Sequence, residues 1–330
     1  MNGLRLGALT CSYVFSNKLS FISQRITNIC CVRTFSVSST LNMKFVQFVY
    51  NNKPAEIRLG YLEGNGVVDV KKHNSGLPCT LLELLKSGSY NEVEKIKAAC
   101  PSIEPSASIT LAAPITGMDK VLCVALNYAD HCKEQNLELP KIPIIFNKFP
   151  SCVIGPNDAV QIRNDITEKV DWEVELTVVI GKKCSNVKAA DAYNYIFGYT
   201  VAQDITARDW QKERNGGQFL LGKAQDTFCP IGPCITTSDE ITDPHNLNIK
   251  CSLNGNIKQN SNTCNLVHKI PDIIERLSSV LTLLPGDIIL TGTPGGVGVH
   301  SKPPLFLKPG DVVSSEIQNI GSFDTQIVKF

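Results

Sequence analysis

The sequence predicts a β-rich α+β fold. Beyond residue 115, short runs of apolar and β-branched residues recur at close intervals, and Gly and Pro punctuate them, which is typical of strands and turns. Few stretches show helical spacing, so neither a doubly wound sheet nor an α/β barrel is expected. With 330 residues, of which 43% are hydrophobic, the chain can bury a large core.

Residues 1–42 have the composition of a mitochondrial transit peptide. Basic residues lie among many serines, and the first acidic residue of the chain is Glu56. The basic residues interrupt any central apolar block, which argues against a secretory signal. Cleavage after Phe35 fits this interpretation, and a disordered extension is the alternative. We therefore predict a location in the mitochondrial matrix and leave these residues out of the fold.

Residues 43–114 are predicted to form a small N-terminal β domain. Its strands are KFVQFVY and the two halves of IRLGYLEGNGVVDV, with a turn at residues 63–66. Thr80 is expected to cap a helix, because Glu83 follows three residues later as in a capping box. A Pro-containing segment then leads into a catalytic domain over residues 115–330. Helices are expected there near His131 and at residues 189–195, 205–212 and 270–277.

The stretch VDWEVELTVVIGKK, residues 170–183, is predicted to be a strand, because apolar residues occupy alternate positions from Trp172 to Ile180. Since strand side chains have a period of two, Glu173 and Glu175 project from one face, about 7 Å apart. Two carboxylates that close are costly to desolvate unless a cation lies between them, and oxygen-only ligands suit Mg²⁺ better than Zn²⁺. The alternative is a solvent-facing strand, on which Glu-x-Glu is common.

A second segment contributes another acidic residue of interest, Asp204. The apolar run 199–202 is expected to form a strand that ends there, and Thr206 fits the N-cap of a helical turn that follows. Arg208 and Gln211, three residues apart, would share one face of that turn and could grip one small ligand. Alternatively, Asp204 only caps the turn and Arg208 is a solvated surface residue.

A third segment, VALNYADHCKEQN, places His131 and Glu134 three residues apart, on one side of a short helix. An imidazole that is hydrogen-bonded to a carboxylate is a common general base near neutral pH. Solvated helices also carry such pairs. Cys132 is a poor candidate nucleophile, because neighbouring residues on a helix point in different directions.

The segment TGTPGGVG, residues 291–298, lacks the Gly-Lys-Ser/Thr of a phosphate loop. We expect it to bring backbone amides and the Thr293 hydroxyl to a carboxylate. The 13 cysteines form no Cys-x-x-Cys pair, so buried reduced thiols are expected and not a zinc site.

Seven segments taken in order resemble the fumarylacetoacetate hydrolase superfamily, and the similarity covers about residues 44–330. They are LNYADHCKE, IGP, VDWEVELTVVIGKK, GYTVAQDITARDWQ, LLGKAQDTFCPIGP, LTLLPGDIILTGTPGGVG and LKPGD. The resemblance implies a mixed β-roll, in which two sheets fold around a metal site, and a homodimer. One departure is Ala224-Gln225-Asp226, where the family usually has an aromatic residue before the Asp. His73, His245, His268 and His300 lie outside these segments and are interpreted as surface or structural.

The resemblance also implies roles for particular residues. Glu173, Glu175 and Asp204 would hold the metal, which we expect to be Mg²⁺, with Ca²⁺ or Mn²⁺ as alternatives. His131 and Glu134 would form the base pair on a mobile lid, with Lys223 as a further catalytic residue. The positions that match contacts to substrate or to metal-bound water are Arg208, Gln211, Lys223 and Thr293.

Such a site would chelate a 2-oxo acid through its carboxylate and keto oxygen and stabilise the enolate formed when a C3 proton leaves. Tautomerisation, decarboxylation and carbon–carbon hydrolysis of an acylpyruvate all remain open. The finer similarity and the predicted mitochondrial targeting favour oxaloacetate keto–enol tautomerisation. A non-catalytic metal-binding protein is the contrasting class.

The composition of the chain limits the classes of partner that are expected. A formal net charge of +1 gives no reason to expect nucleic acid or an anionic membrane surface as a partner. No apolar run approaches the roughly 18 residues needed to span a bilayer. The expected partner is therefore a small-molecule 2-oxo acid, with a second copy of the chain.

Overall fold

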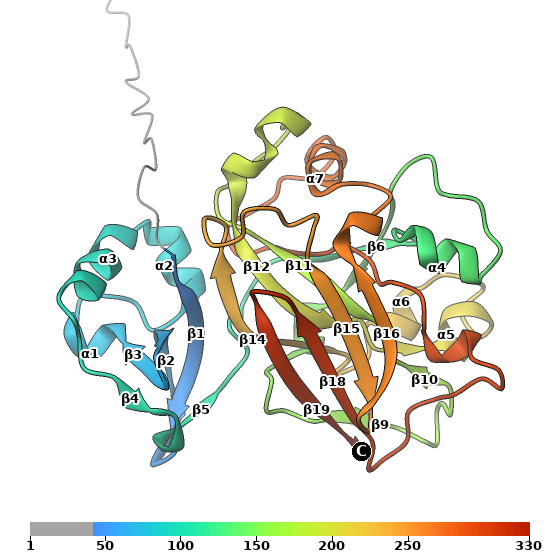
Figure 1. Cartoon of the computed structure of the whole chain (residues 1–330), viewed down its shortest axis with the longest axis horizontal. Helices are drawn as coiled ribbons and strands as arrows, with labels where there is room; N and C mark the ends of the chain where they lie inside the picture. Colours follow the sequence, from blue (N-terminus) through green and yellow to red (C-terminus); the bar gives the residue numbers. More distant parts are fainter. Residues whose placement is uncertain (1–41) are drawn as a thin grey trace, which may run out of the picture. The chain divides into compact units, whose positions relative to one another are not determined.

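Two sheets carry most of the fold of residues 42–330, which are the residues that the computed structural model describes (Figure 1). The larger sheet has 12 strands in the order β4-β3-β2-β1-β14-β12-β11-β17-β6-β7, with β5 paired to β1 and β8 to β14. Its strands are β1 (Lys44–Tyr50), β2 (Lys53–Glu63), β3 (Gly66–Asp69), β4 (Glu104–Pro105), β5 (Ile109–Leu111), β6 (Val121–Ala125), β7 (Ile144–Lys148), β8 (Val153–Ile154), β11 (Val174–Ile180), β12 (Ile196–Gln203), β14 (Cys229–Thr237) and β17 (Ile288–Leu290). The predicted transit peptide lies outside the described residues.

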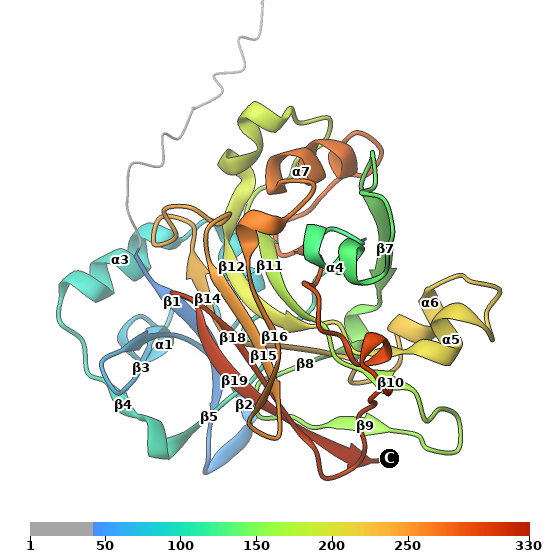
Figure 2. The ribbon, with the colours of Figure 1, turned by 45° about the vertical axis from the view of Figure 1, so that its right-hand side comes forward.

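The second sheet has five strands in the order β16-β15-β18-β19-β9, and β10 pairs with β13 separately. These strands are β9 (Val160–Ile162), β10 (Val170–Asp171), β13 (Thr206–Ala207), β15 (Asn248–Leu253), β16 (Asn256–Asn262), β18 (Val312–Ile317) and β19 (Gly321–Lys329). Two views show the five-stranded sheet lying across β11 and β12 (Figures 1 and 2). The predicted β-rich α+β fold with two packed sheets is confirmed.

Helices are short. The α-helices are α1 (Val70–His73), α2 (Leu81–Ser87), α3 (Tyr90–Ala98), α4 (Ala129–Glu134), α5 (Arg208–Lys212), α6 (Leu220–Lys223) and α7 (Ile270–Ser278). The 3-10 helices are η1 (Ser106–Ser108), η2 (Pro150–Cys152), η3 (Ala189–Tyr195), η4 (Thr263–Asn265) and η5 (Gly298–His300). Within residues 42–330, none of the helices is both long and apolar enough to cross a membrane.

The alternation predicted for residues 172–180 decides which side chains fill the core between the sheets. Trp172, Val174, Leu176, Val178 and Ile180 all belong to one buried cluster, which also holds residues of β15, β18 and β19. A second cluster on the other side of the large sheet includes side chains of α2 and α3. Glu175 therefore projects away from the inter-sheet core, on the opposite face of β11 from Val174 and Leu176.

The N-terminal strands continue the large sheet. In β1, Phe45 pairs with Ile235 of β14, and β2 and β3 form the predicted hairpin around residues 63–66. The Thr80 hydroxyl accepts a hydrogen bond from the backbone N–H of Glu83, so the predicted cap of α2 is present. The division of the chain at residue 114 stays a prediction.

Two local predictions are wrong. The predicted strand over residues 170–183 is broken at Trp172 and Glu173, because the backbone N–H groups of Glu173 and Val174 donate to the side chains of Gln203 and Gln259. Thr206 is not an N-cap. It lies in β13, and its hydroxyl donates to the backbone oxygen of Asp204, so α5 begins two residues later at Arg208.

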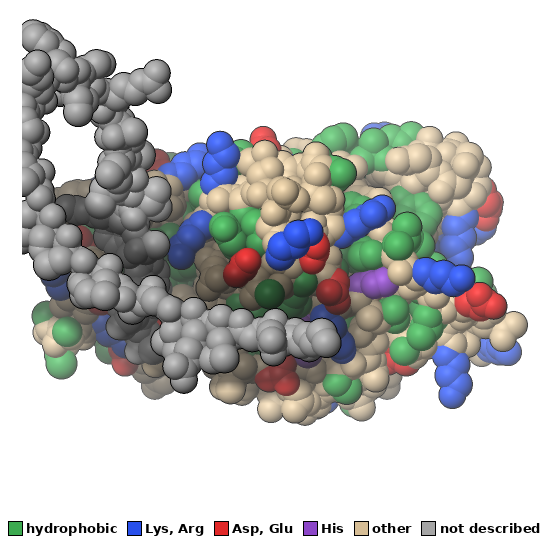
Figure 3. All heavy atoms as spheres, turned by 90° about the horizontal axis from the view of Figure 1, so that it is seen from above, with side chains coloured by type: hydrophobic (Ala, Val, Ile, Leu, Met, Phe, Trp, Pro, Cys, Tyr) green, Lys and Arg blue, Asp and Glu red, His purple; other side chains and the backbone are tan. Residues whose placement is uncertain are grey.

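The surface carries charges of both signs. On the face shown in Figure 3, Lys and Arg side chains lie among Asp and Glu side chains and apolar ones. This mixture agrees with the net charge of +1.

Candidate metal centre and active site

The three predicted acidic residues converge where β11 begins and β12 ends. One carboxylate oxygen each from Glu173, Glu175 and Asp204 lies within 4.8 Å of the others. The antiparallel pairing of β11 with β12 brings them together, since Glu175 lies opposite Ala202 and the N–H of Asp204 donates to the backbone oxygen of Glu173. All three residues are at most 5% exposed, so the solvent-facing alternative is wrong.

Two lysines contact the Asp204 carboxylate. Lys223 donates from Nζ to Asp204 Oδ2 at 2.6 Å and to Glu173 Oε2 at 2.7 Å. Lys148 Nζ lies 2.7 Å from Asp204 Oδ1 and donates to the backbone oxygens of Ile205 and Lys223. The Asp204 carboxylate is thus engaged by cations, and it does not cap the following turn.

Arg208 is buried as well, which rules out the interpretation as a solvated residue. Its Nε donates to Asp171 Oδ2 at 2.8 Å, and its Nη1 lies 2.7 Å from Glu173 Oε1. Nη1 also donates to Gln211 Oε1 at 3.1 Å, so the predicted neighbours on α5 touch. Nη2 is buried and has no hydrogen-bond partner among residues 42–330.

Glu175 differs from the other two acids. Its Oε2 accepts from the N–H of Gly292 at 2.6 Å, and no cation of the described chain pairs with it. Burial, followed by the charges of Asp204 and Glu173, raises the pKa of Glu175 well above its usual value. Burial also pushes the pKa of Glu173 upward, but Lys223 and Arg208 outweigh it and lower that pKa to about 2.

These groups fit a hard divalent cation. The donors are carboxylate oxygens only, which suits Mg²⁺, Ca²⁺ or Mn²⁺ better than a thiolate-seeking metal. The Lys223 ammonium already lies between two of the carboxylates, so their oxygens converge on positive charge. Glu175, buried without a cationic partner, is the carboxylate that a bound cation would compensate.

The predicted base pair is formed on α4. His131 Nδ1 lies 2.7 Å from Glu134 Oε1, and Glu134 Oε2 accepts from the N–H of Gly296 at 2.8 Å. Burial raises the pKa of Glu134, but these two hydrogen bonds outweigh it and the pKa lies below its usual value. Because an ionised carboxylate only accepts, Nδ1 donates, and Nε2 carries the lone pair. Gln135 Nε2 donates to that lone pair at 2.9 Å.

The Gly-rich loop after β17 binds carboxylates of the protein itself. Its amides donate to Glu175, to Glu134 and, from Gly298, to Asp171. Thr293 makes no such contact. Its hydroxyl donates to the backbone oxygen of Val174 and accepts from Gln259. At Gly296, where φ is +102°, a Cβ would lie 2.1 Å from a backbone oxygen, so a side chain does not fit.

The base His131 and the acids Glu173 and Glu175 line one cavity of about 130 Å³. In both ribbon views α4, α5 and α6 lie on the same side of β11 (Figures 1 and 2). It is lined by Val124, Ala125, Leu126, His131, Gln135, Phe146, Glu173, Glu175, Arg208, Gln211, Lys212, Phe219, Lys223, Thr293 and His300. Asp204 and Glu134 lie behind this lining, in contact with Lys223 and His131.

Sequence reasoning does not identify Lys148, Asp171, Lys212 or His300. His300, interpreted above as surface or structural, lines the cavity, and its ring centroid lies 6.2 Å from that of His131. The only signal for Lys148 is its place at the end of the apolar run IIFNK, where a buried charge needs partners. No local pattern marks the other three.

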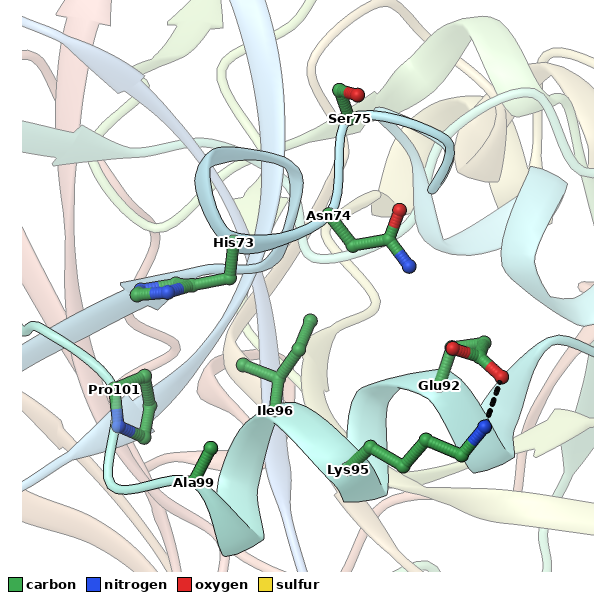
Figure 4. Close-up of a pocket in the computed structure, with 8 residues that line it drawn as sticks. All are labelled: His73, Asn74, Ser75, Glu92, Lys95, Ile96, Ala99 and Pro101. Carbon is green, nitrogen blue, oxygen red and sulfur yellow. Dashed lines mark hydrogen bonds and ion pairs between the residues drawn. The ribbon is translucent and has the colours of Figure 1, made fainter.

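A larger hollow of about 480 Å³ lies between α1 and α3 (Figure 4). Its charged lining residues, Glu92 and Lys95, pair with each other at 2.7 Å across an exposed turn of α3. It contains none of the acidic cluster, so we assign no chemistry to it.

The described cysteines form no disulfide, and most of them are buried, as expected for reduced thiols. Cys132 is buried, and its thiol donates to the backbone oxygen of Leu126. It is absent from the cavity lining, which agrees with the prediction that it is not a nucleophile.

Comparison with known sequences supports the resemblance. The sequence model described as fumarylacetoacetate hydrolase, C-terminal, matches residues 120–328. The chain is 47% identical over 300 residues to a mitochondrial oxaloacetate tautomerase of Xenopus laevis, covering 90% of this chain and 93% of that one. It is 46% identical, over 90% of this chain and 95% of the other, to fumarylacetoacetate hydrolase domain-containing protein 2 of Pongo abelii.

Solved structures agree with the fold. Fumarylacetoacetate hydrolase from Exiguobacterium antarcticum superposes with a TM-score of 0.74 at 32% identity, covering 87% of this chain and 100% of that one. Maleylpyruvate hydrolase from Sphingobium, in complex with manganese(II) and pyruvate, gives a TM-score of 0.72 at 30% identity, covering 87% and 99%.

Proposed function

The chain belongs to the fumarylacetoacetate hydrolase family, and from that premise we propose that it is a divalent-metal-dependent oxaloacetate keto–enol tautomerase. One observation carries the proposal: the His131 base and the Glu173–Glu175 carboxylates line the same small cavity. A proton-transfer group and a cation site for a 2-oxo acid are therefore within reach of one small substrate. The relatives that bear the name oxaloacetate tautomerase support the choice of substrate.

Glu173, Glu175 and Asp204 are the proposed metal ligands, with Mg²⁺ as the proposed ion. When bound, such an ion polarises the substrate carbonyl and stabilises negative charge on its oxygen. The chain orients the ligands in advance: the N–H of Gly292 fixes Glu175, and Lys148 and Lys223 hold Asp204. Such pre-orientation lowers the cost of reorganisation during the reaction.

His131 is the proposed base. Its Nε2 takes a proton from C3 of the keto form and delivers it to the C2 oxygen, which gives the enol. In the reverse direction Nε2 takes the enol O–H proton and delivers it to C3. Glu134 holds Nδ1 at 2.7 Å, which keeps the lone pair on Nε2 and stabilises the ring when it is charged. Gln135 now donates to Nε2, so it must turn away before the substrate proton can be taken.

Arg208, Gln211, Lys223 and Thr293 are proposed to position the substrate, with Lys223 also catalytic through its charge beside the reacting oxygen. The unpartnered Nη2 of Arg208 is the strongest support, because a buried guanidinium nitrogen without an acceptor is costly. A substrate carboxylate would supply that acceptor. Thr293 is the weakest assignment, since its hydroxyl already has two partners.

Cavity size favours a small substrate. About 130 Å³ is well below the roughly 300–1,000 Å³ of pockets for drug-sized ligands, and it suits a four-carbon 2-oxo acid better than an acylpyruvate with a long acyl group. Tautomerisation also needs only one placed base, whereas hydrolysis needs a water aimed at a second carbonyl.

The test follows the ultraviolet absorbance of the oxaloacetate enol with and without Mg²⁺, beside acetylpyruvate cleavage and CO₂ release. We expect Mg²⁺-dependent enol–keto exchange to dominate, and acylpyruvate cleavage to fall as the acyl group grows. A higher kcat/KM for acylpyruvate cleavage would assign the chain to the carbon–carbon hydrolases, and dominant CO₂ release would make it a decarboxylase.

We also propose that the protein is a homodimer of the mitochondrial matrix. The relatives named mitochondrial and the acid-free composition of residues 1–42 support the location. Matrix-restricted labelling of the full chain, and sedimentation of the purified protein, test the two statements separately.

A further inference from the structure

The two ends of the cavity differ in how their charged groups are paired. At the inner end, Lys223 contacts Glu173 and Asp204. Arg208 also contacts Glu173, and in addition Asp171. At the outer end, Lys212 and His300 line the cavity, and neither side chain has a hydrogen bond or ion pair within residues 42–330. An ammonium and an imidazole without an acceptor therefore lie beside a cavity whose lining acids, Glu173 and Glu175, are both at the inner end.

These two side chains come from separate elements. Lys212 is the last residue of α5 and follows Gln211 directly in the chain. His300 is the last residue of η5, which follows the Gly-rich loop in the chain. Partial burial and then the charge of Arg208 lower the pKa of Lys212, although its side chain still reaches solvent. Partial burial and then the charge of Lys212 lower the pKa of His300. Lys212 and Arg208 thus repel each other here, and a bound anion would relieve that repulsion and favour the charged form of His300.

We propose that Lys212 and His300 form a second carboxylate-binding arm, which makes the site selective for 2-oxo dicarboxylates over 2-oxo monocarboxylates. The inference rests on the proposed function for the location of the first carboxylate and keto oxygen, at the acid cluster. The distal carboxylate of a four-carbon substrate then extends toward the outer end. There Lys212 supplies an ammonium and His300 a ring N–H, and both donate to carboxylate oxygens.

The test compares oxaloacetate with its 4-ethyl ester, which keeps the enolisable carbonyl but lacks the distal charge. The variants are Lys212→Met, His300→Phe and the double variant, with Lys86→Met at an exposed position of α2 as the matched control. We expect the ratio of kcat/KM for oxaloacetate to that for the ester to fall about tenfold in the double variant, mainly through KM. Lys86→Met leaves the ratio at the wild-type value.

A binding measurement separates this inference from the proposed function. Calorimetry in the presence of Mg²⁺ measures the affinities for malate and for lactate, so it reports binding of the distal carboxylate without turnover. If malate binds more tightly than lactate and the double variant loses this difference, the arm is supported even when oxaloacetate is not turned over. Absence of oxaloacetate turnover would overturn only the tautomerase proposal. An unchanged malate-to-lactate ratio in the double variant, or equal affinities in the wild type, overturns the arm.

Discussion

The inner and outer ends of the cavity show two ways in which a protein handles charge. At the inner end, acids and bases are buried together, and Asp204, which is fully buried, lies between two lysines. At the outer end, Lys212 is exposed and His300 half-buried, and neither has a partner within the described chain. Paired burial fixes geometry in advance, whereas unpaired groups near solvent stay available to a ligand.

Breaking the pairing at Asp204 should have the largest effect. Asp204→Asn removes the charge opposite Lys148 and Lys223 and one oxygen ligand of the proposed metal. We expect loss of Mg²⁺-dependent activity, together with a loss of about 3 kcal/mol in the free energy of unfolding, since buried Lys148 loses its carboxylate partner and Lys223 keeps only Glu173. Urea denaturation and the enol assay measure the two effects.

Glu175→Gln is the matched comparison within the inner end. The proposed metal ligand is lost, so activity should disappear here as well, and Glu173→Gln should do the same. No cation of the described residues pairs with Glu175, however, so the metal-free Glu175→Gln protein should be at least as stable as the metal-free wild type. Near-normal turnover in all three acid variants would refute the metal assignment.

His131→Ala tests the base independently of the metal. We expect kcat to fall by roughly 10²-fold or more, the usual scale for loss of a general base, with Mg²⁺ affinity little changed. Calorimetric titration with Mg²⁺ provides the control. A collapse of Mg²⁺ affinity would show that His131 is a metal ligand.

Glu134→Gln should act in the same direction but by only about tenfold, because the amide still holds the ring without stabilising its charge. Steady-state kcat measures this. A loss as large as that of His131→Ala would mean that Glu134 itself takes part in proton transfer.

The smallest effect is expected at Cys132, next to the base in sequence. Its thiol points to the backbone oxygen of Leu126, and a serine hydroxyl can make the same bond. Cys132→Ser should therefore retain kcat within a factor of about two. Full inactivation would instead support Cys132 as a catalytic nucleophile, which the sequence spacing argues against.

Local spacing was enough to predict much of the inner end. Glu173 and Glu175 do lie together as the period of two predicts, although Glu173 stands just before β11 begins. The three-residue spacing on α4 lets His131 contact Glu134. It failed at Thr206, because pairing of β13 with β10 takes that residue into a strand and moves the helix start. Local propensity is a weak predictor where tertiary hydrogen bonds compete with it.

The sequence by itself determined the fold class, the short-range pairs and, through its resemblance to a family, the set of acids. Only the tertiary structure decided which cations meet those acids and which remain unpaired. Lys148 comes from β7, Asp171 from β10 and His300 from η5, so their contacts depend on sheet order and loop packing and not on spacing along the chain. Side chains so distant in sequence leave no periodic signal, because their proximity is created only when the chain folds.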